Sequence, residues 1–274
     1  MTGRLAQLHR YPVKSMLGEA LHAVDVDERG LRGDRRLAVL DPATGRVASA
    51  KQPRLWRGLL TVRAVGATPD VGRLLLPDGT TLSTSDASVH EALSTLLGRP
   101  VTLTGDVPAE AVLDRADPDA VLAAGIEATV PATPGALGGA APPGSLVDFA
   151  PVHLIASATL DAIRTAGGGG HPARYRPNLV VESTGDGFVE NDWVGRELRI
   201  GAELTLRVLA PTPRCAVPTL AHGLLPGEPE ALRAPARLNR VVPLPGLGPQ
   251  PCVGAYAVVA RGGRVSVGDP VELV

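Results

Sequence analysis

Hydrophobic residues in the first hundred positions recur in short runs, and turn-forming sequence follows each run. Leu37–Leu40 is followed by Asp41–Gly45, and Leu74–Leu76 is followed by Pro77–Gly79. Short apolar runs bounded by Asp, Pro and Gly are typical of strands joined by tight turns. The pattern therefore predicts β-hairpins in this part of the chain.

The second half contains further strand-like runs at fairly even intervals. Val152–Ile155 has the character of a buried strand. The later runs are Asn178–Val181, Leu204–Leu209, Val253–Val259, Arg264–Val267 and Val271–Val274. Even spacing of short strands is typical of barrels. The predicted fold class is mainly β with a few short helices, as an N-terminal β-barrel-like domain followed by a second β-barrel.

Two segments have helical periodicity instead. The first is predicted to begin with Ser85 as its N-cap and to end at Gly98, ahead of Pro100. Its apolar face consists of Val89, Leu93, Leu96 and Leu97. The second is a short helix capped by Ser157, with Leu160 and Ile163 directed inward.

Residues 123–145 are rich in Ala, Gly and Pro, above all in the stretch Pro134–Gly144. Such a composition does not supply a packed apolar face. We predict a loop or linker here, which divides the chain into an N-terminal domain at 1–122 and a second domain at 146–274.

Composition narrows the possible partners. The 274 residues carry a net charge of −1, so no global field attracts DNA or an anionic membrane, and we expect neither as a partner. The sequence shows no secretion signal and no apolar stretch of the ~18 residues that span a bilayer, which predicts a cytoplasmic protein. Any anion must be bound by a local site.

Two turns could form such a site. Tyr11–Ser15 follows the first strand and places the Lys14 ammonium beside the Ser15 hydroxyl, a pair that can hold a phosphate. A solvated strand end is the simpler alternative. In the turn 30–36, Arg35 could reach an anion, although an ion pair with Asp34 explains it as well.

A third turn, at 174–178, offers Arg176 as a bidentate donor and Asn178 as an amide ahead of an apolar strand. An ordinary strand start is equally consistent with it. Only two of the 27 Lys and Arg residues are lysines, Lys14 and Lys51, which hints that a compact ammonium is needed at both positions.

Cys215 lies after a predicted strand, between Pro213 and Pro218 and next to Arg214. Prolines restrain the loop, and a neighbouring guanidinium favours thiolate over thiol, which suits a reactive or metal-binding sulfur. An inert, buried cysteine is the alternative. Cys252 has no His or Cys partner at zinc spacing and is interpreted as structural or incidental.

Other catalytic motifs are missing from the sequence. The six histidines form no HxxxH or HExxH pair, and no GxSxG occurs, so a zinc hydrolase and an α/β-hydrolase are both disfavoured. Gly167–Gly170 follows a predicted helix and is interpreted as its exit, because a phosphate loop precedes its helix. Two cysteines cannot build a four-thiolate iron–sulfur site, so electrons would come from another protein.

The order of these turns resembles the MOSC family with its N-terminal β-barrel domain, the group that includes the mitochondrial amidoxime-reducing component and bacterial relatives. The resemblance covers nearly the whole chain. Its motifs are Tyr11–Ser15, Gly33–Arg35, Lys51–Leu55, Arg176–Asn178, Asp192–Trp193, Arg214–Cys215, Gly254 with Tyr256, and Val267–Val271.

This resemblance implies a molybdenum cofactor of the molybdopterin type, with chemistry independent of pyridoxal phosphate. Cys215 would be the catalytic thiolate ligand of molybdenum, which agrees with the preference of soft thiolates for such metals. The residues implied to hold the cofactor are Lys14, Ser15, Arg35, Arg176, Asn178 and Arg214. The implied reaction is reduction of N-hydroxylated small molecules, such as hydroxylamines and amidoximes.

The electron donor implied by the resemblance is a separate protein of ferredoxin, flavoprotein or cytochrome type. The chain departs from some relatives at Pro213, where they carry Ser. Two further functions stay open: a sulfur carrier or sulfurtransferase that uses a Cys215 persulfide, and a non-catalytic module that binds the cofactor. No acid or base in the sequence identifies itself.

Overall fold

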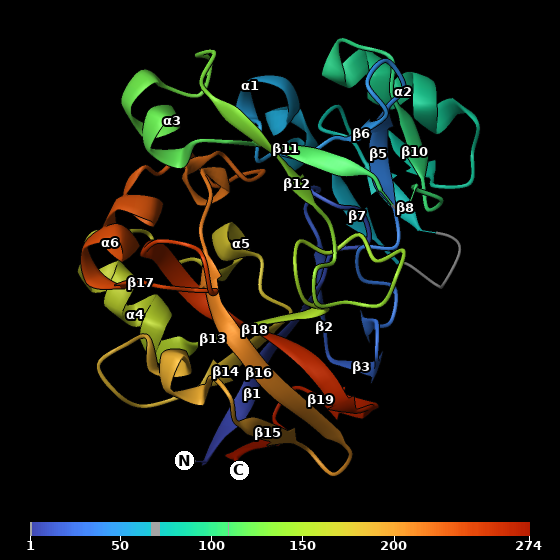
Figure 1. Ribbon diagram of the computed structural model, residues 1–274. Helices are drawn as coiled ribbons and strands as arrows, with labels where there is room; N and C mark the ends of the chain where they lie inside the picture. Colours follow the sequence, from blue (N-terminus) through green and yellow to red (C-terminus); the bar gives the residue numbers. More distant parts are fainter. Residues whose placement is uncertain (1, 67–71, 109) are drawn as a thin grey trace.

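The computed structural model describes residues 2–66, 72–108 and 110–274, with a seven-stranded closed β-barrel as its largest element (Figure 1). The strand order is β13-β14-β1-β20-β15-β16-β18, and pairing of β13 with β18 closes the circle. The barrel strands are β1 (Thr2–Arg10), β13 (Val152–Ala156), β14 (Leu179–Glu182), β15 (Glu197–Ile200), β16 (Leu204–Pro213), β18 (Gln250–Arg261) and β20 (Pro270–Leu273).

Alternating side chains fill the barrel. Every second residue of β16 from Leu204 to Ala210 is buried, as expected for a strand with one face toward a core. The interior is apolar and includes Leu5, Leu154, Leu206 and Ala257. The predicted mainly β fold class with a few short helices is confirmed.

Helices cover one side of this barrel. β13 and β14 are parallel neighbours, and parallel neighbours need a crossover connection, here α4 (Ser157–Thr165) and α5 (Pro172–Tyr175). With α6 (Glu230–Leu238), these helices bury a second apolar cluster that contains Ile155, Leu160 and Ile163. All five residues of β13 are therefore buried, as the sequence predicted for 152–155.

Small sheets form most of the N-terminal half, which lies above the barrel in Figure 1. Both predicted hairpins are present: β5 pairs with β6, and β8 pairs with β9. The elements are β5 (Ala38–Asp41), β6 (Arg46–Val47), α1 (Pro53–Trp56), η1 (Arg57–Thr61), β7 (Arg63–Val65), β8 (Arg73–Leu75), β9 (Thr81–Ser83), α2 (Ser88–Leu97) and β10 (Thr102–Thr104).

Strands from the two halves also pair with each other: β3 pairs with β19, and β2 pairs with the barrel strand β1. The remaining elements of the described chain are β2 (Glu19–Leu21), β3 (Ala23–Asp27), β4 (Gly30–Leu31), η2 (Val189–Trp193), η3 (Val217–Thr219), β17 (Arg240–Val241) and β19 (Gly263–Ser266). The first strand of the predicted N-terminal domain thus lies inside the second barrel, while the division at 122 and 146 stays a prediction.

Two predicted helix caps are wrong. α2 begins at Ser88, because Ser85 uses its hydroxyl in a 2.7 Å contact with Ser83 Oγ and makes no cap. At α4 the N-cap residue is Ala156, and Ser157 is the first helical residue. Its hydroxyl accepts a hydrogen bond from the Ser183 amide at 3.0 Å, which ties the helix to the end of β14.

The prediction of a loop or linker over 123–145 is wrong in part. β12 (Ala132–Ala136) pairs in full with β11 (Val112–Ala116), and α3 (Pro118–Ala124) lies between them. Main-chain hydrogen bonds stabilise such a ribbon without the packed side-chain face that the composition lacks. None of the helices in the described part of the chain combines the length and apolar character needed to cross a membrane.

Candidate functional site

A cavity of about 360 Å³ lies between the two halves of the chain. Its walls come from the turn after β1, the strand β12, the segment before β13 and the loop after β16. All seven residues predicted as site residues line it: Lys14, Ser15, Arg35, Arg176, Asn178, Arg214 and Cys215. Positions 200 residues apart in sequence therefore meet in one place.

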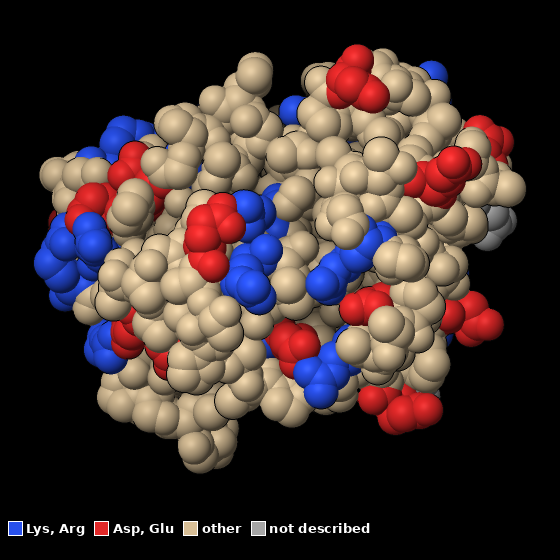
Figure 2. All heavy atoms as spheres, turned by 90° about the horizontal axis from the view of Figure 1, so that it is seen from above, with Lys and Arg blue, Asp and Glu red and all other residues tan. Residues whose placement is uncertain are grey.

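The cavity is strongly cationic although the chain is nearly neutral. Among its described lining residues, Asp148 is the single carboxylate, against seven basic side chains. These are Lys14, Arg35, Lys51, Arg115, Arg174, Arg176 and Arg214. Figure 2 shows basic side chains gathered near the middle of the hollowed face seen from above. Positive charge is thus concentrated in this cavity although the chain carries a net charge of −1.

Asp148 joins the two lysines of the chain. Its Oδ1 lies 2.7 Å from Lys14 Nζ, and its Oδ2 lies 2.8 Å from Lys51 Nζ. Lys14 also donates to the Leu146 carbonyl at 2.9 Å. The Lys14 and Lys51 side chains are 4% and 10% exposed, whereas the Asp148 side chain keeps 34% exposure. The carboxylate is thus the most exposed member of this cluster.

Burial changes the proton affinity of this cluster. Burial lowers the pKa of Lys14 to about 8, although Asp148 acts in the opposite direction, and burial also lowers the pKa of Lys51. Burial alone would raise the pKa of Asp148, but Lys14 and Lys51 hold it well below its usual range. Asp148 is therefore ionised at neutral pH.

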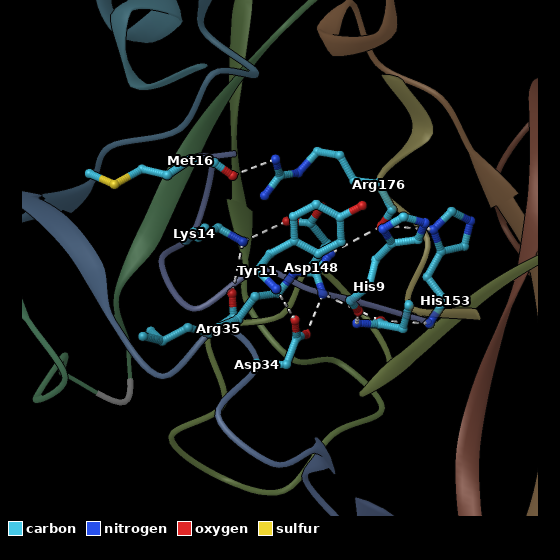
Figure 3. A network of polar contacts seen from close by, with 11 residues as sticks. His9, Tyr11, Lys14, Met16, Asp34, Arg35, Asp148, His153 and Arg176 are labelled. Atoms are coloured by element: carbon cyan, nitrogen blue, oxygen red, sulfur yellow. Dashed lines mark hydrogen bonds and ion pairs between the residues drawn. The ribbon is translucent and has the colours of Figure 1, made fainter. Parts of the chain in front are cut away.

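Two arginines stack on Tyr11 beside this cluster (Figure 3). The guanidinium carbons of Arg35 and Arg176 lie 5.0 and 4.3 Å from the ring centroid. Arg35 is paired with Asp34, whose other oxygen accepts from the Tyr11 amide at 2.7 Å. The ion pair considered from sequence is thus present, and Arg35 lines the cavity as well.

Arg176 has no carboxylate partner in the described chain. One nitrogen, Nη1, donates to the Met16 carbonyl at 2.6 Å, while Nη2 is buried without a partner. Burial, and then the charge of Arg35, lower its pKa to about 10. A buried guanidinium with an unused donor leaves the cavity able to bind an acceptor.

Backbone strain coincides with this site. Four non-glycine residues in the described chain have positive φ angles, and three of them line the cavity: Ser15 at 64°, Arg35 at 46° and Arg176 at 56°. Each left-handed residue of this kind costs on the order of 1 kcal/mol, and such residues cluster at binding sites. The fold therefore maintains an unfavourable conformation at the turns that the sequence singled out.

Asn178 and Ser15 are engaged with the protein itself. The Asn178 side chain donates to the His9 carbonyl at 3.3 Å and accepts from the His153 amide at 3.2 Å. The Ser15 hydroxyl accepts from the Ala50 amide at 3.1 Å. Both residues position the surrounding backbone in this structure.

Arg214 braces the loop that carries Cys215. Its Nε and Nη1 donate to the carbonyls of Val253 and Tyr175 at 3.1 and 3.0 Å, and Nη2 contacts His153 Nε2. Burial and the charge of Arg214 hold the pKa of His153 well below its usual range. A neutral His153 can then accept from Arg214 at Nε2 and donate from Nδ1 to the Arg176 carbonyl, 3.3 Å away.

Cys215 is partly exposed and lines the cavity, whereas Cys252 is buried. Cys215 packs beside Ala50 and Leu60 of the N-terminal half, so both halves hold its loop. Burial raises the pKa of Cys252 to about 11, which disfavours its thiolate form and agrees with its interpretation as structural or incidental. The described chain contains no group of three or more His, Cys, Asp or Glu that could hold a metal ion. A metal here would need further ligands from a cofactor.

Among the described charged and histidine side chains that line the cavity, the sequence did not predict five: Lys51, Arg115, Asp148, His153 and Arg174. Lys51 carried a signal, because it is one of only two lysines. Asp148 and His153 carried no signal of a site: His153 lies in the run predicted as a buried strand, and only the fold brings the two residues to Lys14 and Arg214.

Two parts of the chain match known families. Residues 142–272 match the MOSC domain, and residues 2–98 match the MOSC N-terminal beta barrel domain. No curated protein matches the chain. The crystal structure of the YUAD protein from Bacillus subtilis is similar at 13% identity and a TM-score of 0.47, over 100% of this chain and 96% of that one. The structure of YiiM from Escherichia coli is 18% identical, with a TM-score of 0.31, over 46% of this chain and 54% of that one.

Proposed function

Because the chain belongs to the MOSC family, we propose that it is a molybdenum-cofactor-dependent reductase that removes oxygen from N-hydroxylated compounds. One observation carries the proposal: a partly exposed thiol, Cys215, shares a cavity with seven basic side chains and a single carboxylate. A cofactor with a phosphate and a thiolate-bound metal needs both features together.

The residues present fit such a cofactor. Arg176 has a buried donor without a partner, and the buried Thr212 hydroxyl, also in the cavity wall, has none either. Lys14, Lys51 and Arg35 provide further positive charge for an anionic group. Cys215 would provide the thiolate to molybdenum. When bound, the cofactor would supply the oxygen-accepting two-electron chemistry, which no side chain of this chain can supply.

The protein's own contribution is orientation and charge. Arg214 fixes the Cys215 loop through the Val253 and Tyr175 carbonyls. Asp148 holds the Lys14 and Lys51 ammonium groups at the cavity wall through ion pairs of 2.7 and 2.8 Å.

The proposed partners follow from the chemistry. The substrate is a small N-hydroxylated molecule, and electrons come from a separate protein of ferredoxin, flavoprotein or cytochrome type. A nearly neutral chain has no net charge that would attract nucleic acid, so we expect none as a partner. We place the protein in the cytoplasm and expect no membrane partner.

The test is metal analysis of protein made in a host that synthesises the cofactor. We expect molybdenum equimolar with the chain, lost in Cys215→Ala and retained in the matched variant Cys252→Ala. Turnover of a hydroxylamine or amidoxime with an artificial reductant then separates a reductase from a module that only binds the cofactor. Absence of molybdenum from the wild-type protein would overturn the proposal.

The same preparation tests the sulfur-carrier function. If Cys215 carries a persulfide, mass spectrometry shows an added sulfur that reducing agents remove and that Cys215→Ala lacks. That result in molybdenum-free protein would favour a sulfurtransferase.

A further inference from the structure

The loop between β17 and β18 places two leucines on the cavity wall. Leu244 and Leu247 both line the cavity, and the Leu247 amide donates to the Leu244 carbonyl at 3.1 Å. Pro245 and Gly246, with φ of +84°, occupy the centre of this turn, as is typical of type II. Such a turn brings its first and last residues together, so the leucines form one apolar corner. Leu247 remains 47% exposed.

The loop with this corner and the loop of Cys215 line the same cavity. The Arg214 amide donates to the Pro251 carbonyl at 2.9 Å, and Pro213 pairs with Cys252 at the start of β18. The segment that follows the turn is therefore tied to the segment that leads into Cys215. Phe149, whose ring lies 5.3 Å from that of Tyr256, adds a further apolar surface to the cavity wall.

The basic residues and the apolar residues of the cavity wall favour different properties of a ligand. Seven basic side chains against one carboxylate repel a cationic molecule. The exposed leucine side chains neither donate nor accept a hydrogen bond, so they bind a ligand through apolar contact alone. A ligand in this cavity therefore binds more tightly if it has an apolar body and more weakly if it carries a positive charge.

We infer that the protein takes uncharged N-hydroxylated compounds with an aromatic or branched alkyl body, and that Leu244 and Leu247 bind this body. The inference rests on the proposed reductase function. For an amidoxime, two electrons from the donor protein and two protons cleave the N–O bond and give an amidine and water. The amidine then takes up a proton, and the cationic cavity favours its release.

Binding of a non-reducible amide tests the inference without turnover. The probe is 2-naphthamide, measured by ligand-detected NMR on the purified wild-type protein. We expect Leu247→Ser to weaken its affinity about tenfold, because roughly 50 Å² of apolar contact is lost. The matched control is Leu238→Ser, since Leu238 is 49% exposed but does not line the cavity, and its affinity should equal that of the wild type.

Charge is tested with 2-naphthamidine, which has the same shape and a positive charge. It should bind at least several-fold more weakly than the amide. Equal affinity of amide and amidine, failure of the wild type to bind the amide, or equal loss in both leucine variants would each overturn the inference.

Turnover distinguishes this inference from the proposed function. In protein loaded with cofactor, Leu247→Ser should raise KM for naphthamidoxime about tenfold and leave acetamidoxime within about twofold. If no N-hydroxylated compound is reduced while the amide still depends on Leu247, the proposed function fails and the apolar binding site stands. If Leu247→Ser raises KM equally for both amidoximes, the leucine corner does not select for an apolar body.

Discussion

The barrel interior and the cavity differ in polarity, in hydrogen bonding and in backbone strain. The described interior of the barrel is apolar, with Leu154 and Leu206 fully buried on regular strands. The cavity wall holds buried ammonium and guanidinium groups, a guanidinium nitrogen without a partner, and three left-handed residues. The barrel therefore stabilises the fold, and part of that stability offsets an unfavourable but functional arrangement beside it.

The largest expected effect is in the barrel. Leu154→Ala removes a fully buried side chain and should lower the free energy of unfolding by about 2–5 kcal/mol. Chemical denaturation measures this loss. The control is Leu238→Ala at an exposed position, which should cost under about 0.5 kcal/mol. Equal losses would mean that the barrel interior is not the source of stability.

Asp148→Asn should have the next largest effect. It leaves two buried ammonium groups without their shared carboxylate, and because Asp148 is partly exposed we expect a loss of about 1–3 kcal/mol. Added orthophosphate should restore more stability to this variant than to the wild type, since the anion replaces the lost charge. Thermal melts in phosphate and in chloride of equal ionic strength check this. If phosphate stabilises the variant and the wild type equally, Lys14 and Lys51 are not part of an anion site.

The pH dependence of stability should show the cost of burying Lys14. Its folded-state pKa of about 8 lies below the unfolded value of 10.5, so the unfolded chain binds the proton more tightly between these values. The contribution of Lys14 to stability therefore rises with pH in this window. From about pH 8 to about pH 9.5, wild type should gain about 1–2 kcal/mol relative to Lys14→Met in denaturant titrations. A falling difference would contradict the lowered pKa.

The smallest effect concerns backbone strain at Ser15. Ser15→Gly and Ser15→Ala both remove the hydroxyl that accepts from the Ala50 amide, but only glycine relieves the left-handed φ of 64°. Ser15→Gly should thus be more stable than Ser15→Ala by about 1 kcal/mol. In the barrel the order should reverse, with Ala257→Gly less stable than the wild type. Equal stability of the two Ser15 variants would show that the left-handed backbone at Ser15 carries no strain.

Sequence reasoning succeeded where the determinants are local. Short apolar runs predicted the buried strand β13 and, with the turn residues 41–45, the hairpin of β5 and β6, because each pattern reflects burial of its own residues. The motifs around Lys14, Arg176 and Cys215 were singled out by residue type and turn chemistry, and the fold brings all three to one cavity.

Sequence reasoning failed where contacts between residues far apart in the sequence determine the structure. Asp148 gains its importance from Lys14 and Lys51, about a hundred or more residues earlier, and no pattern near it signals that pairing. The ribbon of β11 and β12 depends on main-chain pairing, which composition does not reveal. Ser85 and Ser157 suited a cap by type, yet partners at Ser83 and Ser183 took up their hydroxyls.

The position of β1 has a consequence for how the chain folds during synthesis. β1 contains residues 2–10 and pairs with β14 and with β20, which contains residues 270–273. The ribosome releases β1 long before β20, so the barrel cannot close until β20 has emerged. Contacts at such sequence separation slow folding and leave strand edges exposed in the meantime. A fragment starting at residue 146 would lack β1, so we expect the edges of β14 and β20 that pair with β1 to stay open in it.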